Sequence, residues 1–120
     1  MESLAARDQM ACCQVTQQSF LRLITTEAIM RTFGCAPLSN AQAWKKWEEM
    51  DSFTPELILL PVPDGLNAHW QSYSSRPTPS PKLWMDAYLA AFARAADCRM
   101  VTFDGGFRRF KGLDLMLLGV

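Results

Sequence analysis

Four short and continuously apolar segments are spaced along the chain, and each predicts a buried strand. They cover residues 10–15 (MACCQV), 56–60 (ELILL), 99–103 (RMVTF) and 114–118 (DLMLL). Apolar runs of this length are typical of strands that are covered on both faces. The second run is closed by prolines, which cannot donate a hydrogen bond to a sheet ladder.

Segments with helical spacing of apolar residues fill the intervals between these runs. After the first run, Thr16 resembles a helix N-cap, and apolar residues recur at helical spacing from Phe20 to Ile24. The stretch 74–81 (SSRPTPSP) is a predicted loop because it is rich in proline and serine. The other predicted helical segments are residues 1–8 (as the end of a helix), about 27–32, a segment capped by Ser39 or Asn40, 66–73, and a helix from Pro81 or Lys82 to about 96.

Alternation of short apolar strands with helices predicts an α/β fold whose parallel sheet is covered on both faces. The chain has 120 residues, of which 49% are hydrophobic. This size suits one domain, residues 1–120, with one core. No apolar run is long enough to span a membrane, and no signal peptide is evident, so a cytoplasmic location is expected.

Charge and cysteine content narrow the function only slightly. Basic and acidic residues both number 12, so net charge does not indicate a polyanionic partner. Between positions 76 and 111, however, seven basic residues stand against three acidic ones, which is compatible with RNA as a substrate. The four cysteines have no metal-binding spacing, and Cys12 and Cys13 fall in an apolar run, which indicates buried thiols.

Asp86 is the first candidate for chemistry. Its neighbours at helical spacing are mostly small or apolar, among them Leu83, Leu89 and Ala90. An unpaired carboxylate in such a stripe is costly, whereas a helix N-terminus or a bound cation stabilises it. The alternative is that Asp86 only complements the helix dipole, and from the residues alone the two readings are about equally supported.

Asp104 is the second candidate, because it directly follows the strand predicted over 99–103. In open α/β sheets ligands bind at the carboxyl ends of the strands, so a functional carboxylate belongs there. Asp-Gly is also a common turn pair, and aspartate caps helices well or begins a hairpin. Two carboxylates at one sheet edge are able to hold a hard cation such as Mg²⁺ or Mn²⁺, but weakly without a third.

Other chemistries find little support in the sequence. The single histidine, His69, is expected on a surface helix, and no serine has a suitable histidine partner for a Ser–His–Asp triad. Gly105-Gly106 lacks the lysine and the spacing of a phosphate-binding loop. The tryptophans are able to stack on bases, although Trp44 and Trp47, three residues apart, are more often core or interface residues.

Four blocks of the sequence together resemble PIN-domain toxins of the VapC type. They are TQQSFLRLIT (16–25), SNAQAW (39–44), SPKLWMDAYLAAFARAA (80–96) and RMVTFDGGFRRFKGLDLMLL (99–118). The specific parts are Asp-Ala-Tyr-Leu-Ala-Ala and Val-Thr-Phe-Asp-x-Gly-Phe. The resemblance covers nearly the whole chain and implies a three-layer α/β/α sandwich.

The same resemblance implies a metal-dependent endoribonuclease, the toxin of a toxin–antitoxin system. It implies Mg²⁺ or Mn²⁺ as cofactor, RNA as substrate, a cognate antitoxin and a homodimer. Asp86 and Asp104 match the family's acidic positions and carry over as catalytic metal ligands. Gln17 stands where many members have glutamate and is a weaker catalytic candidate, because its carbonyl oxygen brings no charge. Candidates for binding the RNA are Arg22, Lys82 and Arg108.

The chain departs from the family at its start. PIN domains open with a central strand that ends in aspartate, and nothing before Met10 matches that strand. The unit expected to be missing, a strand and a helical crossover, amounts to on the order of thirty to forty residues. Without it two neighbouring strands lack a partner and the site lacks a carboxylate. The alternative function is therefore an inactive truncated PIN domain that only binds an antitoxin or a PIN partner.

Overall fold

A computed structural model describes residues 10–53 and 58–119, with side chains for all of these except 51–53. The chain divides into two compact units, Met1–Pro61 and Val62–Val120, and each is described by itself. The helical end predicted over 1–8 and the start of the strand predicted over 56–60 lie outside the described residues. The prediction of one domain over 1–120 stays a prediction.

The first unit contains one parallel strand pair, β1 (Ala11–Cys12) with β2 (Ile58–Leu59). The Ile58 N–H donates to the Met10 carbonyl at 2.8 Å, and the Leu60 N–H donates to the Cys12 carbonyl at 2.9 Å. The first strand is shorter than predicted, and the second ends one residue earlier than predicted, at Leu59. The run 10–15 is cut short because a helix begins at Gln14 and takes over the backbone hydrogen bonds.

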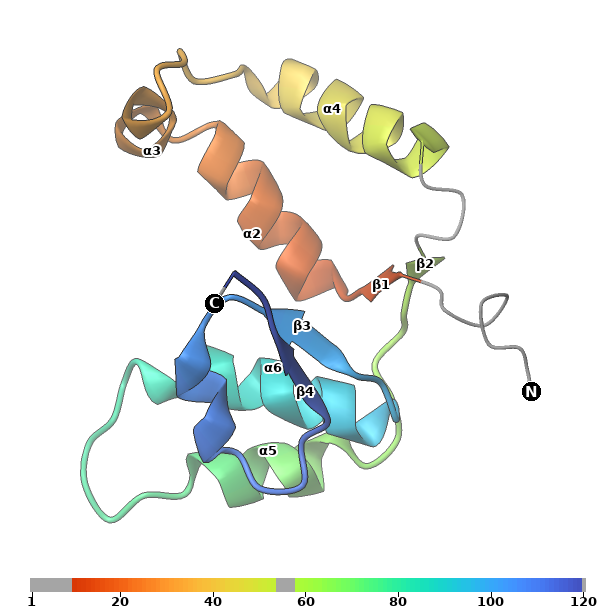
Figure 1. The fold of residues 1–120 in the computed structure, drawn as a ribbon, viewed down its shortest axis with the longest axis vertical. Coiled ribbons are helices and arrows are strands. Elements are labelled where there is room, and N and C mark those ends of the chain that lie inside the picture. The colour runs from red at the N-terminus through yellow and green to blue at the C-terminus, as the bar shows by residue number, and fades with distance from the viewer. Residues whose placement is uncertain (1–9, 54–57, 120) are drawn as a thin grey trace. The chain divides into compact units, whose positions relative to one another are not determined.

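Three helices follow β1 in this unit: α2 (Gln14–Ile24), α3 (Glu27–Thr32) and α4 (Asn40–Phe53) (Figure 1). The prediction that Thr16 caps the first helix is wrong. The N-cap is Cys13, a buried residue with extended backbone, whose carbonyl accepts from the Gln17 N–H at 3.0 Å. Thr16 lies one turn inside the helix, where its hydroxyl contacts the Cys13 sulfur at 3.3 Å.

Ser39 caps α4, as predicted, through a reciprocal pair of hydrogen bonds. The Gln42 N–H donates to the Ser39 hydroxyl at 3.1 Å, and the Ser39 N–H donates to the Gln42 side-chain carbonyl at 2.9 Å. This capping box satisfies two backbone groups that the helix would otherwise leave without a partner. The rings of Phe20 and Trp47, 5.9 Å apart, join α2 to α4, whereas Trp44 is half exposed.

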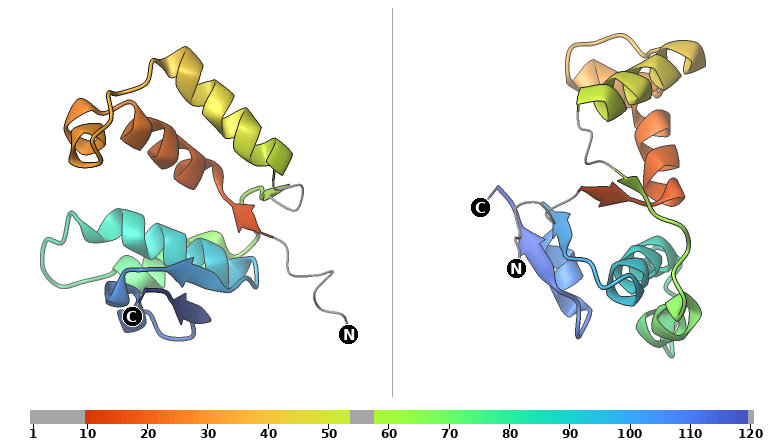
Figure 2. Two further views of the ribbon diagram at one scale, coloured as in Figure 1. Left: turned by 45° about the horizontal axis from the view of Figure 1, so that its top comes forward. Right: turned by 90° about the vertical axis from the view of Figure 1, so that its right-hand side faces the viewer.

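The second unit is built on α5 (Leu66–Ser74) and α6 (Leu83–Ala95), which pack side by side in both views (Figures 1 and 2). Small side chains on α6 allow the close approach, since Ala87 and Ala90 have no exposed surface. The Trp70 indole N–H donates to the Trp84 carbonyl at 3.1 Å, which ties α5 to the start of α6. The residues between the two helices form the predicted loop.

After α6 come β3 (Met100–Thr102), a short 3-10 helix η1 (Gly105–Arg109) and β4 (Leu115–Leu117). The strands β3 and β4 pair in parallel, with Met100 opposite Leu115. A hairpin after Asp104 is therefore excluded, because η1 and not a returning strand follows it. The core of this unit contains Leu83, Ala87, Ala90, Phe107 and Phe110.

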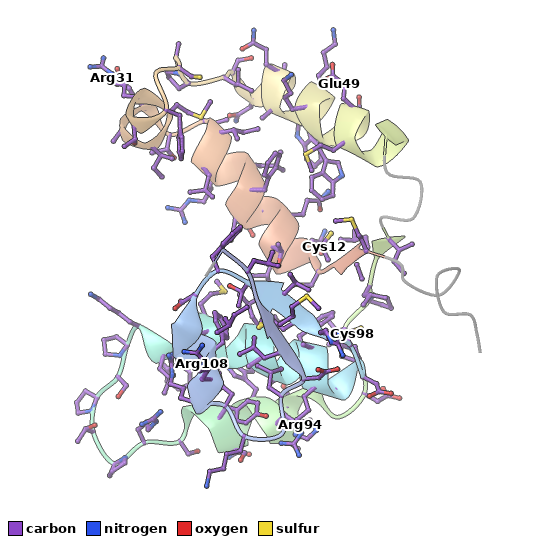
Figure 3. The ribbon with its side chains drawn as sticks, viewed as in Figure 1. Cys12, Arg31, Glu49, Arg94, Cys98 and Arg108 are labelled. Atoms are coloured by element: carbon purple, nitrogen blue, oxygen red, sulfur yellow. The ribbon has the colours of Figure 1, made fainter. Side chains whose placement is uncertain are left out.

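Arg94 joins α6 to the turn that leads into β4 (Figure 3). Its guanidinium donates to the Lys111 carbonyl at 3.1 Å and to the Tyr73 hydroxyl at 3.2 Å. The next residue, Gly112, has a positive φ of 81°, and a Cβ there would lie 2.6 Å from the Arg94 guanidinium carbon. Only glycine suits this position without strain.

The α/β class and the parallel pairing of strands are confirmed. In the described residues the strands form two separate pairs, β1–β2 and β3–β4, so a single sheet is not observed there. The three-layer sandwich and the absence of a first central strand stay predictions. Among the described helices, none has the length and hydropathy needed to cross a bilayer.

Candidate functional site

Asp104 lies at the carboxyl end of β3, where the sequence places it. Its Oδ1 accepts from the Gly106 N–H at 2.8 Å, so the residue is the N-cap of η1. Its own N–H donates to the Thr102 hydroxyl at 3.1 Å. These bonds fix one carboxylate oxygen at an exposed position and leave the other oxygen without a hydrogen bond to the described residues, so that a ligand can reach it.

Asp86 lies in the first turn of α6, beside the buried side chains of Leu83, Ala87 and Ala90. The side chain of Asp86 is 35% exposed, so it lies at the edge of this apolar face of α6. An Asp86 oxygen, Oδ2, lies 3.1 Å from Nη2 of Arg109. The Asp86 carboxylate, for which the sequence indicates no partner, is therefore paired with Arg109 of η1.

Arg109 connects the two aspartates. Its Nη2 binds Asp86, and its Nη1 donates to the Gly106 carbonyl at 2.8 Å. The N–H of Gly106 is the group that Asp104 caps. The guanidinium also lies over the Phe110 ring, 4.6 Å from its centroid, so it is held from several sides. Asp86 and Asp104 therefore belong to one hydrogen-bonded network.

Gly106 is the tightest point of this network. A Cβ there would lie 2.9 Å from Arg109 Nη1 and 3.0 Å from Asp104 Oδ1. Its φ is not in the left-handed region, so the backbone itself would accept alanine. The lack of a side chain, and not backbone conformation, is what the network requires of this residue.

Sequence reasoning missed Arg109, although the Gly-Gly-Phe-Arg-Arg pattern contains a usable signal. An aspartate that caps a short helix places the end of that helix one turn away, and Arg108 and Arg109 are its last residues. Adjacent residues on a 3-10 helix leave it roughly 120° apart, so at most one of the two faces the preceding helix. The sequence does not reveal which one, because that depends on the packing of Phe107 and Phe110.

The other predicted site residues fall into two groups. Lys82 is the N-cap of α6, one turn before Asp86, and Arg108 lies exposed on η1 (Figure 3). Both belong to the second unit, together with the aspartates. Gln17, half-buried, and Arg22, exposed, lie on α2 in the first unit. Grouping of Gln17 and Arg22 with the two aspartates stays a prediction.

The donor set fits a hard cation only in part. Carboxylate oxygens are suitable ligands for Mg²⁺ or Mn²⁺. Among the side chains that the structure describes, those of residues 10–50 and 58–119, no three His, Cys, Asp or Glu residues gather as a metal-binding cluster. Two carboxylates alone would hold such an ion weakly, and Arg109 already balances the charge of Asp86.

Comparison with known proteins identifies the family. The sequence pattern of the PIN domain matches residues 2–113. The chain belongs to the PIN-domain family. This PIN domain is also 41% identical over 106 residues to Ribonuclease VapC41 of two strains of Mycobacterium tuberculosis, CDC 1551 / Oshkosh and ATCC 25618 / H37Rv. The match covers 88% of this chain and 73% of each relative. The VapC-type resemblance seen in the sequence is therefore confirmed.

Proposed function

We propose that this PIN domain is an endoribonuclease of the VapC toxin type that hydrolyses RNA phosphodiester bonds with the help of a divalent cation. The observation that carries the proposal is the 41% identity to a relative named a ribonuclease, over 88% of the chain. The network of Asp86, Asp104 and Arg109 supports it. Asp104 follows β3 and Asp86 lies in the first turn of α6, and Arg109 joins the two carboxylates in one hydrogen-bonded group.

In this proposal Asp86 and Asp104 hold Mg²⁺ or Mn²⁺. Such an ion, when bound, polarises the phosphodiester and activates water. Asp104 would present Oδ2, the carboxylate oxygen that does not cap η1, and Asp86 would exchange its contact with Arg109 for the cation. Arg109, once released, is close enough to both carboxylates to take a phosphate oxygen of the substrate, a role that suits its planar guanidinium.

Basic residues of the second unit would hold the RNA backbone. Lys82 and Arg108 are exposed and flank the two aspartates along α6 and η1. Each contact to a phosphate releases counterions, which makes RNA affinity depend on salt. Gln17 would orient a water or a substrate group through its amide, and Arg22, on the same helix, would bind a phosphate.

The proposal includes partners of the VapC type. A cognate antitoxin would restrain the RNase, the active form would be a homodimer, and the protein would act in the cytoplasm. These features rest on the family resemblance and on the relative's name. Size-exclusion chromatography of the chain with and without its antitoxin measures the oligomeric state and complex formation, and RNA cleavage under the same two conditions measures the restraint.

A cleavage assay with matched variants tests the proposed function. A structured RNA is incubated with the whole chain and Mg²⁺ or Mn²⁺, beside Asp86→Asn and the control Asp97→Asn. Asp97 has a φ of 57°, which asparagine also adopts readily, so the control loses the same charge without strain. We expect Asp86→Asn to lose roughly a hundredfold or more in cleavage rate and Asp97→Asn to retain it.

One observation favours the second candidate, an inactive PIN domain that only binds an antitoxin or a PIN partner. Asp86 is already paired with Arg109, and the described residues contain no cluster of three metal ligands. For this candidate Arg109 would be a permanent structural partner of Asp86. Folded protein that shows no cleavage with either metal, while it binds the antitoxin, would support this candidate over the ribonuclease.

A further inference from the structure

The second unit contains an open groove that the proposed catalytic residues do not line. It lies between α5, the loop after α5 and the start of α6, and has a volume of about 830 Å³. This volume falls within the range of sites that take small organic groups. Asp86, Asp104 and Arg109 are not among the residues that line it.

An exposed indole forms one wall of this groove. Trp84 is 58% exposed, although it stands beside Trp70 with the two rings 6.3 Å apart and nearly perpendicular. The Trp70 indole N–H donates a hydrogen bond to the Trp84 carbonyl, which holds the two residues together. Trp84 therefore presents a large aromatic surface at the groove on a helix that holds it still.

The rest of the groove is lined partly by polar side chains that are available to bind a ligand. The side chains of Asn67, Gln71 and Arg76 make no hydrogen bond or ion pair with the described part of the protein. The two amides offer both donors and acceptors, and Arg76 supplies one positive charge. None of the described lining residues is acidic.

We propose that this groove binds a base of single-stranded RNA, with the base stacked on Trp84, its edge on Asn67 or Gln71 and a flanking phosphate on Arg76. An aromatic face with a nearby cation is the combination by which proteins hold unpaired bases without strict sequence preference. This inference deepens the proposed ribonuclease function and rests on it for the nature of the substrate.

Position on α6 relates the groove to the two aspartates. Trp84 and Asp86 are two residues apart on one helix, so their side chains leave it on different faces. An RNA strand with one base in the groove would cross the first turn of α6 to bring a phosphodiester to Asp86. Lys82, exposed at that turn, lies on this path. The groove would thus select a single strand and set which bond is cut.

An acidic peptide is the other occupant that a basic, partly aromatic groove is able to accept. Arg76 is the only charged residue among the described lining residues, and the remaining polar groups are amides and hydroxyls that suit a base edge. An acidic peptide would gain one ion pair with Arg76, and its carboxylates would leave most of these amides and hydroxyls without a hydrogen-bond partner. The observations therefore favour RNA.

Fluorescence anisotropy of a labelled ten-nucleotide single-stranded oligoribonucleotide tests the inference. The parent is the whole chain with Asp86→Asn, which keeps the probe intact. Trp84→Leu is expected to weaken binding by about tenfold, the scale of one stacked base. Trp44→Leu is the matched control, since Trp44 is a tryptophan of similar exposure (50%) that does not line the groove. It should change the affinity by less than about twofold.

Two further variants guard against a folding defect. Trp84→Phe keeps a stacking ring and should recover most of the affinity that leucine loses. Arg76→Gln should weaken binding a few-fold and lower the slope of log affinity against log salt by about one. If Trp84→Leu binds as the parent does, or if the parent binds a glutamate-rich peptide through Trp84 more tightly than RNA, the proposal is overturned.

Cleavage measured in parallel separates this inference from the proposed function. RNA binding that depends on Trp84 without cleavage that depends on Asp86 supports the groove and contradicts the ribonuclease. Cleavage that depends on Asp86, with RNA affinity indifferent to Trp84, supports the ribonuclease and contradicts the groove. A chain that neither binds nor cleaves RNA contradicts both.

Discussion

Replacement of Arg109 by glutamine should strengthen the binding of a divalent cation to this protein. Arg109 and Asp86 form an ion pair with 37% and 35% of their side chains exposed, and a cation must break it to use the carboxylate. Pairs this exposed are screened by solvent and contribute at most about 1 kcal/mol. Removal of this competition therefore corresponds to binding that is tighter by up to about fivefold.

Titration of Mn²⁺, followed by electron paramagnetic resonance of the free ion, measures this affinity without any need for activity. Arg108→Gln removes the same charge one residue away, at a side chain without an ion pair to the described residues, and should change the affinity by less than about twofold. Equal or weaker Mn²⁺ binding by Arg109→Gln would refute the argument that Arg109 occupies the place of the cation.

Further predictions concern stability. Ser39→Ala removes the capping box of α4 and should cost about 1 kcal/mol in urea unfolding, whereas an unchanged midpoint would show that the cap contributes nothing. Gly112→Ala should cost more than about 1 kcal/mol because of its positive φ and its clash with Arg94, while Gly105→Ala, without either constraint, should be nearly neutral. Phe107→Ala empties a core position that is only 6% exposed and should cost roughly 3–5 kcal/mol, seen as a lower midpoint of urea unfolding.

Local chemistry made most elements of the fold predictable. Ser39 and Gln42 form a capping pattern that is visible in the sequence, and the Pro- and Ser-rich stretch can only be a loop. The start of α2 was mispredicted because Thr16 is a better cap by residue type than Cys13. Burial of Cys13 in an extended conformation outweighs that preference. Strand ends were also overestimated, since an apolar run does not reveal where pairing stops.

Those parts of the site that depend on a single residue at a recognisable place in the fold were predictable. Asp104 follows a strand and Asp86 opens a helix, and both facts can be read from the sequence. The ion pair between Asp86 and Arg109 was not predictable, because it depends on how η1 packs through Phe107 and Phe110 onto α6. Contacts between residues 23 positions apart follow from tertiary packing, which hydrophobic spacing alone does not encode.

In the proposed function Asp86 and Asp104 together form the catalytic centre, and Asp104→Asn separates a catalytic role of Asp104 from a purely structural one. Asparagine caps a helix as well as aspartate does, so this variant should keep the hydrogen bond to the Gly106 N–H and an unchanged melting temperature. We expect its RNA cleavage rate in Mg²⁺ or Mn²⁺ to fall by roughly a hundredfold or more. Cleavage at the wild-type rate would show that Asp104 is only the cap of η1 and would contradict its proposed catalytic role.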